Sequence, residues 1–440
     1  FRSLSHIAKV TQGDFLSLSI TLYNLLVFII LPAIEVRAVL QYLSSYFKFL
    51  AFTGSSVSTG NYLLAFTLLG LITWVNLYGA RVTAVLTKGV VFFKLITPIL
   101  LCGSFLYVLS DSGSLDHARL VGTPISWNQI FQAIATSGII FSFNGFNQAT
   151  FFAGEARNPQ KAVPFAILGS LFISGFLYVL IQYVFLMAVP NESLIRGWDH
   201  LSFPGDEGPF AGIAALLGLS GLLIVIYADA VVSPLGTAFS YASTAPRLFH
   251  TLFQDLFREG RLLKSNQYGM SPATVGITFV LECLAFVYLP NLKAMISLLV
   301  AAFVLCYTVA PAILLTLRRT QPDLPRPFRV RMVYGVAFLA LFFSNLMVFS
   351  CGWNALKNLL CFSIALLGVY LAFHLKKSGK SLTQTKLRGS GWFLFQLFSI
   401  GALGYYNSRS QFSFTLVLLS VGGVSLVALL LSQFPRIRLK

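Results

Sequence analysis

The chain has 440 residues, of which 56% are hydrophobic and only 10% are charged, and its formal net charge is +17 at pH 7. This composition excludes an ordinary soluble domain and predicts an all-α polytopic membrane protein, because a helix needs about 20 apolar residues to cross a bilayer. The positive charge is spread over several short loops, which argues against a nucleic-acid partner, since such a partner requires one continuous basic surface.

Apolar runs predict twelve transmembrane segments joined mostly by short loops. In chain order they cover residues 15–47, 62–78, 84–109, 130–153, 162–189, 219–248, 272–289, 292–317, 333–353, 356–375, 391–406 and 412–431. The first run is too long for an upright span, so we expect it to tilt or to extend beyond the bilayer.

Lysine and arginine are concentrated in alternate loops. The loop after residues 292–317 carries Arg318, Arg319, Arg326, Arg329 and Arg331, and the loop after residues 356–375 is also basic, whereas the opposite loops hold few cations. The positive-inside rule therefore places these loops and both termini in the cytoplasm. The sequence thus predicts an integral plasma membrane protein in contact with membrane lipid, and a bacterial inner membrane is the simplest setting.

Charged residues inside the first and third predicted spans include Glu35, Arg37 and Lys94. Glu35 and Arg37 lie near the outer end of the first span, and we expect them to be interfacial. Lys94 lies inside the apolar run VVFFKLITPILL, where an ionised lysine costs about 2.5–3.5 kcal/mol. It follows Arg81 by about 20 Å of helix, so reaching the cytoplasmic face would require a tilted or late-starting helix. We therefore favour a functional role for Lys94 over simple snorkelling.

The fourth predicted span is interrupted in the middle. Its sequence IIFSFNGFNQATFFAGEARNP, residues 139–159, places polar Ser142, Asn144 and Asn147 and flexible Gly145 within an apolar run. In hydrocarbon every backbone polar group needs a partner, so a helix breaks only where it lines a cavity or packs on protein. Broken helices of this kind hold substrate and ions in many secondary transporters.

The sixth predicted span carries a polar stripe. Asp229, Ser233 and Thr237 recur at every fourth residue and share one helical face, which at this depth normally points into the bundle. Ser233 and Thr237 could instead bond to their own backbone, with Asp229 meeting a neighbouring helix. Glu282, in the middle of the seventh span, is either a proton carrier or a structural residue, and its role is left open.

The sequence shows no catalytic triad, phosphate loop or metal-ligand spacing, so we expect neither an enzyme nor a metal or other cofactor. The five cysteines all lie in apolar segments and are typical of small core residues.

Residues 141–167 combine an aromatic-x-aromatic-x-Gly break, an acidic residue ahead of Asn-Pro, and a further proline. The residues are Phe141, Phe143, Gly145, Glu155, Asn158, Pro159 and Pro164. Together with residues 229–247 and 317–330, this stretch resembles the sixth helix, the eighth helix and the loop after the tenth helix of the amino acid–polyamine–organocation (APC) superfamily permeases. The resemblance covers about residues 13–353, and the combination of motifs is specific.

The resemblance implies a five-plus-five inverted-repeat fold of the LeuT type. In this register residues 1–440 form a single transmembrane transporter domain: 14–110 are the remainder of the first repeat, 130–317 the second repeat, 333–375 helices eleven and twelve, and 391–431 a C-terminal helical hairpin. The family's first two helices have no counterpart in the sequence. We therefore expect an N-terminally truncated permease that lacks the first hairpin.

The resemblance also implies which residues form the site. The substrate-binding residues are Phe141, Ser142, Phe143, Asn144, Gly145, Phe146 and Asn147, and the coupling or gating residues are Lys94, Asp229, Ser233 and Thr237. Lys94 matches a lysine that takes the place of a sodium ion in some members, which implies sodium-independent transport by proton coupling or exchange. Asn147 stands where some exchangers have a glutamate, and an asparagine cannot titrate. We expect Lys94 to approach Ser233 and Thr237.

The sequence therefore predicts secondary active transport of amino acids or related amines across the plasma membrane. The alternative is a non-transporting membrane sensor or an inactive truncated permease remnant. Because the family's first helix supplies half of the site, we expect the 440-residue chain alone not to transport. The transported amino acid, the coupling ion and association into a homo-oligomer are left open.

Overall fold

The computed structural model describes residues 4–44, 59–111, 126–151, 153, 156–190, 198, 201, 208–257, 264–289, 292–323, 325–326, 328–377 and 389–433, so Glu155 of the family motif lies outside the described residues. All regular structure in these ranges is helical, which confirms the all-α prediction. The chain divides into two compact units. Unit 1 comprises residues 1–27, 124–171 and 293–440, and unit 2 comprises residues 28–123 and 172–292. Two long helices, α2 (Asp14–Ser44) and α8 (Pro159–Ala188), contribute to both units.

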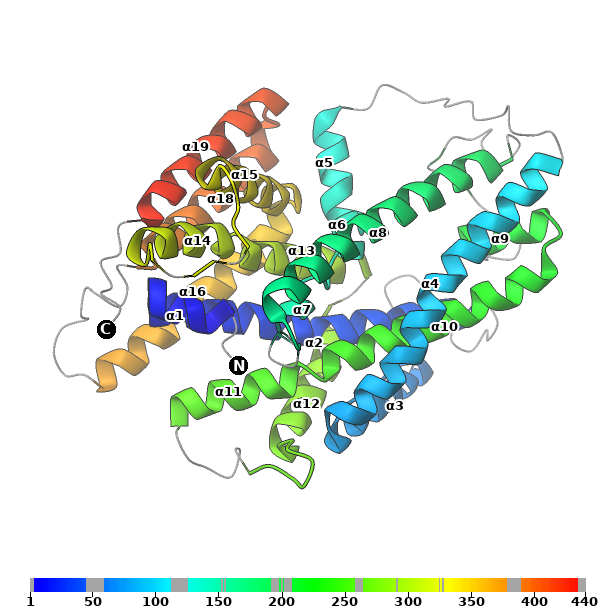
Figure 1. The fold of residues 1–440 in the computed structure, drawn as a ribbon, viewed down its shortest axis with the longest axis horizontal. Helices are drawn as coiled ribbons and strands as arrows, with labels where there is room; N and C mark the ends of the chain where they lie inside the picture. The colour runs from blue at the N-terminus through cyan, green and yellow to red at the C-terminus, as the bar shows by residue number, and fades with distance from the viewer. Residues whose placement is uncertain are drawn as a thin grey trace. The chain divides into compact units, whose positions relative to one another are not determined.

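Unit 1 holds the interrupted fourth segment and the C-terminal third of the chain (Figure 1). Its helices are α1 (Leu4–Gln12), the start of α2, α5 (Trp127–Thr136), α6 (Ile139–Ser142), α7 (Gln148–Phe151), the start of α8, α13 (Leu292–Tyr307), α14 (Val309–Thr320), α15 (Val333–Ser350), α16 (Trp353–Lys377), α18 (Gly391–Ser410) and α19 (Phe414–Ser432). The hairpin α18–α19 packs on α15, and α15 also packs against α5 and α14. The C-terminal hairpin is thus an integral part of unit 1.

Unit 2 holds the remaining helices, of which α4 and α10 form the most extensive pair. Its elements are the end of α2, α3 (Thr59–Val75), the short helix η2 (Asn76–Tyr78), α4 (Ala80–Asp111), the end of α8, α9 (Pro209–Leu216), α10 (Ser220–Ala242), α11 (Ala245–Phe257) and α12 (Pro272–Tyr288). Helix α12 packs on α3 and α11, and α10 also contacts α3 and α9. Two of these helix crossings bring polar residues together. Lys94 of α4 meets Thr237 of α10, and Thr73 of α3 meets Glu282 of α12.

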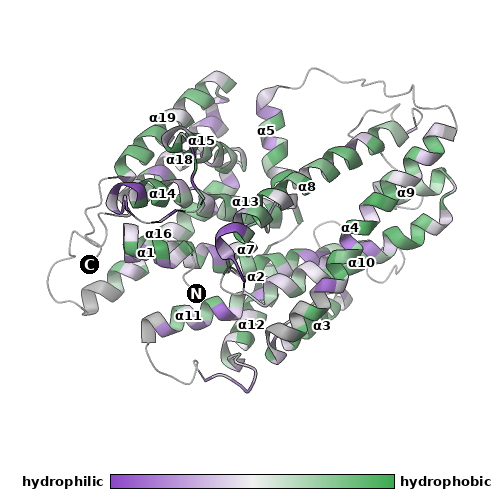
Figure 2. Ribbon diagram, viewed as in Figure 1, coloured by the Kyte–Doolittle hydropathy of each residue, from purple (hydrophilic) through white to green (hydrophobic). Residues whose placement is uncertain are grey.

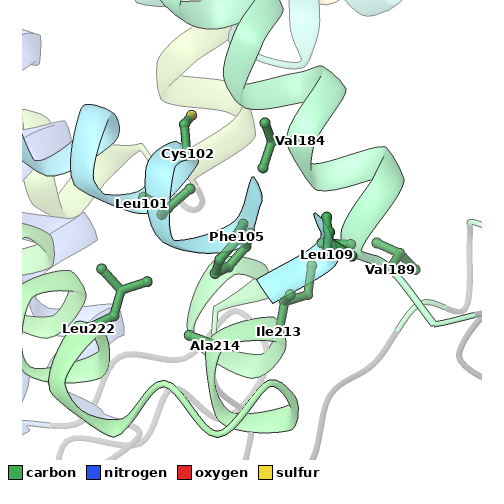
Figure 3. Close-up of a cluster of buried hydrophobic side chains, with 10 residues drawn as sticks. Leu101, Cys102, Phe105, Leu109, Val184, Val189, Ile213, Ala214 and Leu222 are labelled. Carbon is green, nitrogen blue, oxygen red and sulfur yellow. The ribbon is translucent and has the colours of Figure 1, made fainter. Parts of the chain in front are cut away.

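One end of unit 2 is closed by an apolar cluster (Figure 3). Leu101, Phe105 and Leu109 of α4 meet Val184 of α8, and Ile213 of α9 completes the contact. Helix α9 starts with a proline at its first turn, where the missing N–H is not needed. This cluster holds one end of α4 against α8, α9 and α10.

Nine helical segments among the described residues are long and apolar enough to cross a membrane, and hydrophobic residues dominate them in Figure 2. They are Asp14–Ser44, Gly60–Tyr78, Lys88–Ser110, Pro159–Ala188, Ser220–Gln254, Ala294–Thr320, Val333–Ser350, Trp353–Ala372 and Phe414–Ser432. Three predicted segments are absent from this set. Residues 130–153 are broken into short helices, α12 has only 17 residues, and α18 carries Gln396, Asn407 and Arg409.

The polar side chain of Gln12 joins four helices of unit 1. Its Nε2 donates to Thr316 Oγ1 of α14 at 2.7 Å and to the Ser432 carbonyl of α19 at 3.3 Å, and its Oε1 accepts from Trp392 Nε1 of α18 at 3.1 Å. A Cβ on Gly389 would lie only 2.0 Å from the Gln12 carbonyl oxygen, so only glycine fits there. The end of α1 is therefore fixed by residues from the far end of the chain.

Replacing Gln12 by alanine should destabilise the protein measurably. The change leaves the buried indole N–H of Trp392 without its acceptor, and an unsatisfied buried donor costs about 1–3 kcal/mol. Thermal unfolding of the purified protein in detergent checks this, with Gln132→Ala on the exposed face of α5 as the matched control. Equal melting temperatures for the two variants would show that the Gln12 contacts contribute nothing.

Candidate functional site

The fourth segment is interrupted twice in unit 1. Helix α5 begins at a capping box in which Ser126 and Gln129 bond to each other's backbone, and it ends at Thr136. Gly138 then adopts a left-handed conformation with φ of 92°, which favours glycine. The helical turn α6 follows and ends at Ser142. The sequence predicted the second interruption and missed the first, although Gly138 was its visible signal.

The predicted departure from helical hydrogen bonding between Phe141 and Asn147 begins only at Phe143, because Phe141 and Ser142 belong to the helical turn α6. The amides of Phe143 and Asn144 bond to carbonyls only three residues back, at 3.2 and 3.1 Å. Gly145 then turns the chain with φ of 105°. Among the described residues, the amides of Gly145 and Phe146 donate to no backbone carbonyl. The regular ladder resumes only in α7, so backbone polar groups at the turn are free to meet other partners.

The side chains of this turn are aromatic rings and amides. The Phe146 ring packs on the Tyr307 ring of α13 with centroids 5.1 Å apart, and the Tyr307 hydroxyl donates to Asn144 Oδ1 at 3.4 Å. Asn144 Nδ2 and Asn147 Oδ1 are buried and have no hydrogen-bond partner among the described residues. The turn thus holds one unpaired donor and one unpaired acceptor beside an aromatic pair. Buried polar atoms in this state are uncommon and call for an explanation.

The other predicted residues of the turn occupy its edges. Phe141 and Phe143 are half-buried, and Ser142 is exposed with its Oγ donating to the Ile139 carbonyl at 2.7 Å. Sequence reasoning did not find Tyr307, because a tyrosine in an apolar run gives no periodic signal. Its pairing with Asn144 depends on how α13 packs in unit 1.

A second polar cluster lies in unit 2, where α4 crosses α10. The Lys94 ammonium of α4 donates to Thr237 Oγ1 of α10, which confirms the predicted approach of Lys94 to this face. Thr237 in turn donates to the Ser233 carbonyl at 3.1 Å, and the Ser233 hydroxyl donates to Asp229 Oδ1. Hydrogen bonds therefore link the four predicted residues in sequence, although the Ser233 carbonyl and hydroxyl serve two separate bonds.

The crossing brings α4 and α10 unusually close. A Cβ on Gly236 would lie 2.2 Å from Cγ1 of Val90, which is one helical turn before Lys94. Pro98 lies four residues after Lys94 and has no N–H, so the Lys94 carbonyl loses its helical partner. Pro234 does the same to the Ala230 carbonyl on α10. Glycine therefore permits the close approach of the two helices, and each helix loses one backbone hydrogen bond to a proline.

Glu35 of α2 belongs to the surroundings of this cluster. Its carboxylate and that of Asp229 both act electrostatically on the Lys94 ammonium. Glu35 and Arg37 are only 9% and 5% exposed, so both side chains are buried in the protein. That they lie at the level of the membrane interface stays a prediction. Two acidic side chains therefore act on the partly buried Lys94.

The turn at residues 141–147 belongs to unit 1 and the Lys94 cluster to unit 2, and each stands on its own contacts. Among the described residues, no group of three His, Cys, Asp or Glu side chains is arranged to hold a metal ion.

A helical membrane protein that breaks one spanning segment at an amide-lined turn and buries a lysine among hydroxyls is organised as a membrane transporter. The sequence profile of the family described as "Amino acid permease" matches residues 6–370, so the chain belongs to this family of the APC superfamily. It is a transporter of amino acids and not an enzyme.

Characterised relatives match most of the chain. The glutamate/serine transporter AimA of Bacillus subtilis is 29% identical over 382 residues, which cover 85% of this chain and 70% of the relative. The aspartate-proton symporter of Bacillus subtilis is 28% identical over 429 residues, covering 94% of this chain and 81% of the relative. The branched-chain amino acid permease BcaP of the same organism is 24% identical over 262 residues, covering 58% and 52%.

Gly236→Ala should destabilise the protein by about 1–3 kcal/mol, because the new methyl group overlaps Val90. Gly221→Ala is the matched control on the same helix, since a Cβ there meets no atom within 4 Å. This control should be neutral or slightly stabilising, because alanine is the better helix former. Combining Gly236→Ala with Val90→Ala should restore much of the lost thermal stability; a purely additive double variant would refute the close contact.

Proposed function

We propose that the turn at residues 141–147 binds the transported amino acid. The observation that carries this proposal is the pair of buried, unpaired atoms Asn144 Nδ2 and Asn147 Oδ1. An amino acid zwitterion presents an ammonium donor and a carboxylate acceptor, so it can satisfy an unpaired acceptor and an unpaired donor together. The free amides of Gly145 and Phe146 offer further donors, and the rings of Phe146 and Tyr307 can pack on the substrate.

The substrate class follows from the relatives that match along most of the chain. Their names specify glutamate and serine for one and aspartate with a proton for the other. We therefore propose acidic and small polar amino acids as the first substrates to test. The predominance of amides and backbone donors at the turn suits a carboxylate-bearing substrate.

Coupling is proposed to be sodium-independent and to use protons or exchange. The Lys94 ammonium supplies a fixed positive charge at the α4–α10 crossing, and its hydrogen bond to Thr237 engages a hydroxyl that a cation would otherwise use. Asn147 cannot titrate, so a proton must bind elsewhere. The name of the aspartate-proton symporter supports proton coupling among the relatives.

The proposed architecture is the five-plus-five inverted repeat, with residues 14–110 in the first repeat, 130–317 in the second, and hairpins at 333–375 and 391–431. The protein would lie in a bacterial inner membrane with both termini cytoplasmic, as the basic loops indicate. Association of the chain into a homo-oligomer is left open.

Because the 440-residue chain alone is expected not to transport, uptake of radiolabelled glutamate, aspartate and serine into proteoliposomes tests the substrate site in the complete permease. Asn144→Ala should lower uptake about 5- to 150-fold at subsaturating substrate, because a buried hydrogen-bonding group lost from a site costs about 1–3 kcal/mol. Ser170→Ala, exposed on α8, is the control and should transport normally. Unchanged uptake by Asn144→Ala would exclude the turn, and substrate binding without uptake would favour a sensor.

Lys94→Ala should abolish uptake, and Lys94→Arg should restore it only in part, because the planar guanidinium is larger and binds hydroxyls in a different geometry. Lys88→Ala is the matched control, since Lys88 is exposed on the same helix. Replacing sodium by potassium in the uptake buffer should leave the wild-type rate unchanged. A sodium requirement would contradict the role proposed for the Lys94 ammonium.

A further inference from the structure

Glu282 is a second ionisable group inside unit 2, separate from the Lys94 cluster. It lies on α12 facing α3 and is 0% exposed. Its Oε2 is 2.9 Å from the hydroxyl of Thr73 on α3. Its other oxygen, Oε1, is buried and has no hydrogen-bond partner among the described residues. A carboxyl group is thus enclosed at the α3–α12 crossing with one hydroxyl as its neighbour.

The hydrogen bonds at Thr73 show which group carries the proton. The Thr73 hydroxyl oxygen is also 2.6 Å from the Leu69 carbonyl, one turn earlier on α3. A hydroxyl has a single hydrogen, and a carbonyl and a carboxylate can only accept. If Thr73 donates to Leu69, as Thr67 on the same helix donates to Leu63, the contact with Glu282 needs a hydrogen from Glu282. A protonated Glu282 that donates through Oε2 to Thr73 leaves the single Thr73 hydrogen for the Leu69 carbonyl, so both contacts of the Thr73 hydroxyl are satisfied.

The surrounding charges agree with a neutral acid. Ionisable side chains on the elements around α12 include Glu35 and Arg37 of α2, Tyr62 of α3, Tyr78 of η2, Arg247 and His250 of α11, and Cys283 and Tyr288 of α12 itself. Arg37 contacts α12 one turn beyond Glu282, where its Nη2 donates to the Phe286 carbonyl at 2.8 Å.

The Arg37 guanidinium also stacks over the Phe286 ring, with its carbon 4.7 Å from the ring centroid. Among the described residues, no lysine, arginine or histidine forms an ion pair with Glu282. An isolated buried carboxylate is far more costly than a neutral acid, because the charged form loses its hydration without a compensating cation.

We propose that Glu282 is a proton-binding site: it is held as a neutral carboxylic acid by Thr73 and releases its proton only when α3 separates from α12. The carboxylate needs water or new donors, and the packed crossing supplies neither. Proton release is therefore linked to a rearrangement of this helix pair. The protonated state stands on the hydrogen-bond geometry alone, whereas a part in coupling rests on the proton-driven transport proposed above.

Infrared spectroscopy of the purified protein in lipid tests the protonated state. The carbonyl stretch of a protonated carboxyl group should be present near neutral pH and should be lost in Glu282→Gln. Thr73→Val should shift this band, because it removes the acceptor of the acid hydrogen. Thr67→Val is the matched control, since Thr67 bonds only to its own helix and is exposed. No band lost in Glu282→Gln would overturn the proposal.

Stability and transport give two independent readouts. Glutamine resembles a neutral acid and can donate to Thr73, so Glu282→Gln should melt close to wild type. A marked drop in melting temperature would instead reveal an ionised carboxylate with a cationic partner, and would overturn the proposal. In proteoliposomes, Glu282→Gln should lose the several-fold stimulation of uptake by an inward proton gradient.

If the proton gradient still stimulates uptake by Glu282→Gln, Glu282 takes no part in coupling. If wild-type protein takes up amino acids without any response to the gradient, proton coupling itself fails, and the infrared band still decides the protonation of Glu282. If wild type takes up no amino acid at all, the proposed substrate site fails, and that outcome is equally separate from the infrared result.

Discussion

The interior of a membrane supplies no hydrogen bonds, so each polar side chain buried in a spanning helix depends on a partner from the protein itself. This constraint explains why the polar residues of the chain occur at helix crossings. Lys94 meets Thr237 where α4 crosses α10, and Glu282 meets Thr73 where α12 crosses α3. The crossings exist because apolar faces pack there, and the polar contacts then fix which residues face each other.

The two crossings of unit 2 handle charge in different ways. At the first, an ammonium donates to the hydroxyl of Thr237, and two acidic residues, Glu35 and Asp229, act on it electrostatically. At the second, a carboxyl group has a single hydroxyl neighbour and no ion pair among the described residues. A buried side chain can stay ionised where oppositely charged groups lie close to it. A buried acid without a cationic partner is instead more stable in its neutral, protonated form. One helical unit thus contains a fixed charge and a site suited to gaining and losing one.

Much of this organisation could be predicted from the sequence. Lys94 stood out because a lysine is expensive in an apolar run, and the stripe of Ser233 and Thr237 offered its oxygens. The interruption at residues 141–147 was visible because Ser, Asn and Gly are unfavourable in an apolar spanning helix, where polar groups need partners. The pairings of Asn144 with Tyr307 and of Glu282 with Thr73 were not visible. These pairings depend on which helices pack together. Local sequence patterns do not indicate contacts between residues that are far apart in the chain.

The contacts of Gln12 also affect how the protein is made. Its partners Thr316, Trp392 and Ser432 follow it by 304, 380 and 420 residues. At about 5–20 residues per second, a ribosome needs roughly 20 to 80 s to synthesise the last of them after Gln12. Until Thr316 is synthesised, none of these partners exists, so the amide of Gln12 must be hydrated. Helix α1 is therefore among the last to reach its final environment. The hydrogen bonds of Gln12 remain incomplete in the nascent permease until α19 has been inserted.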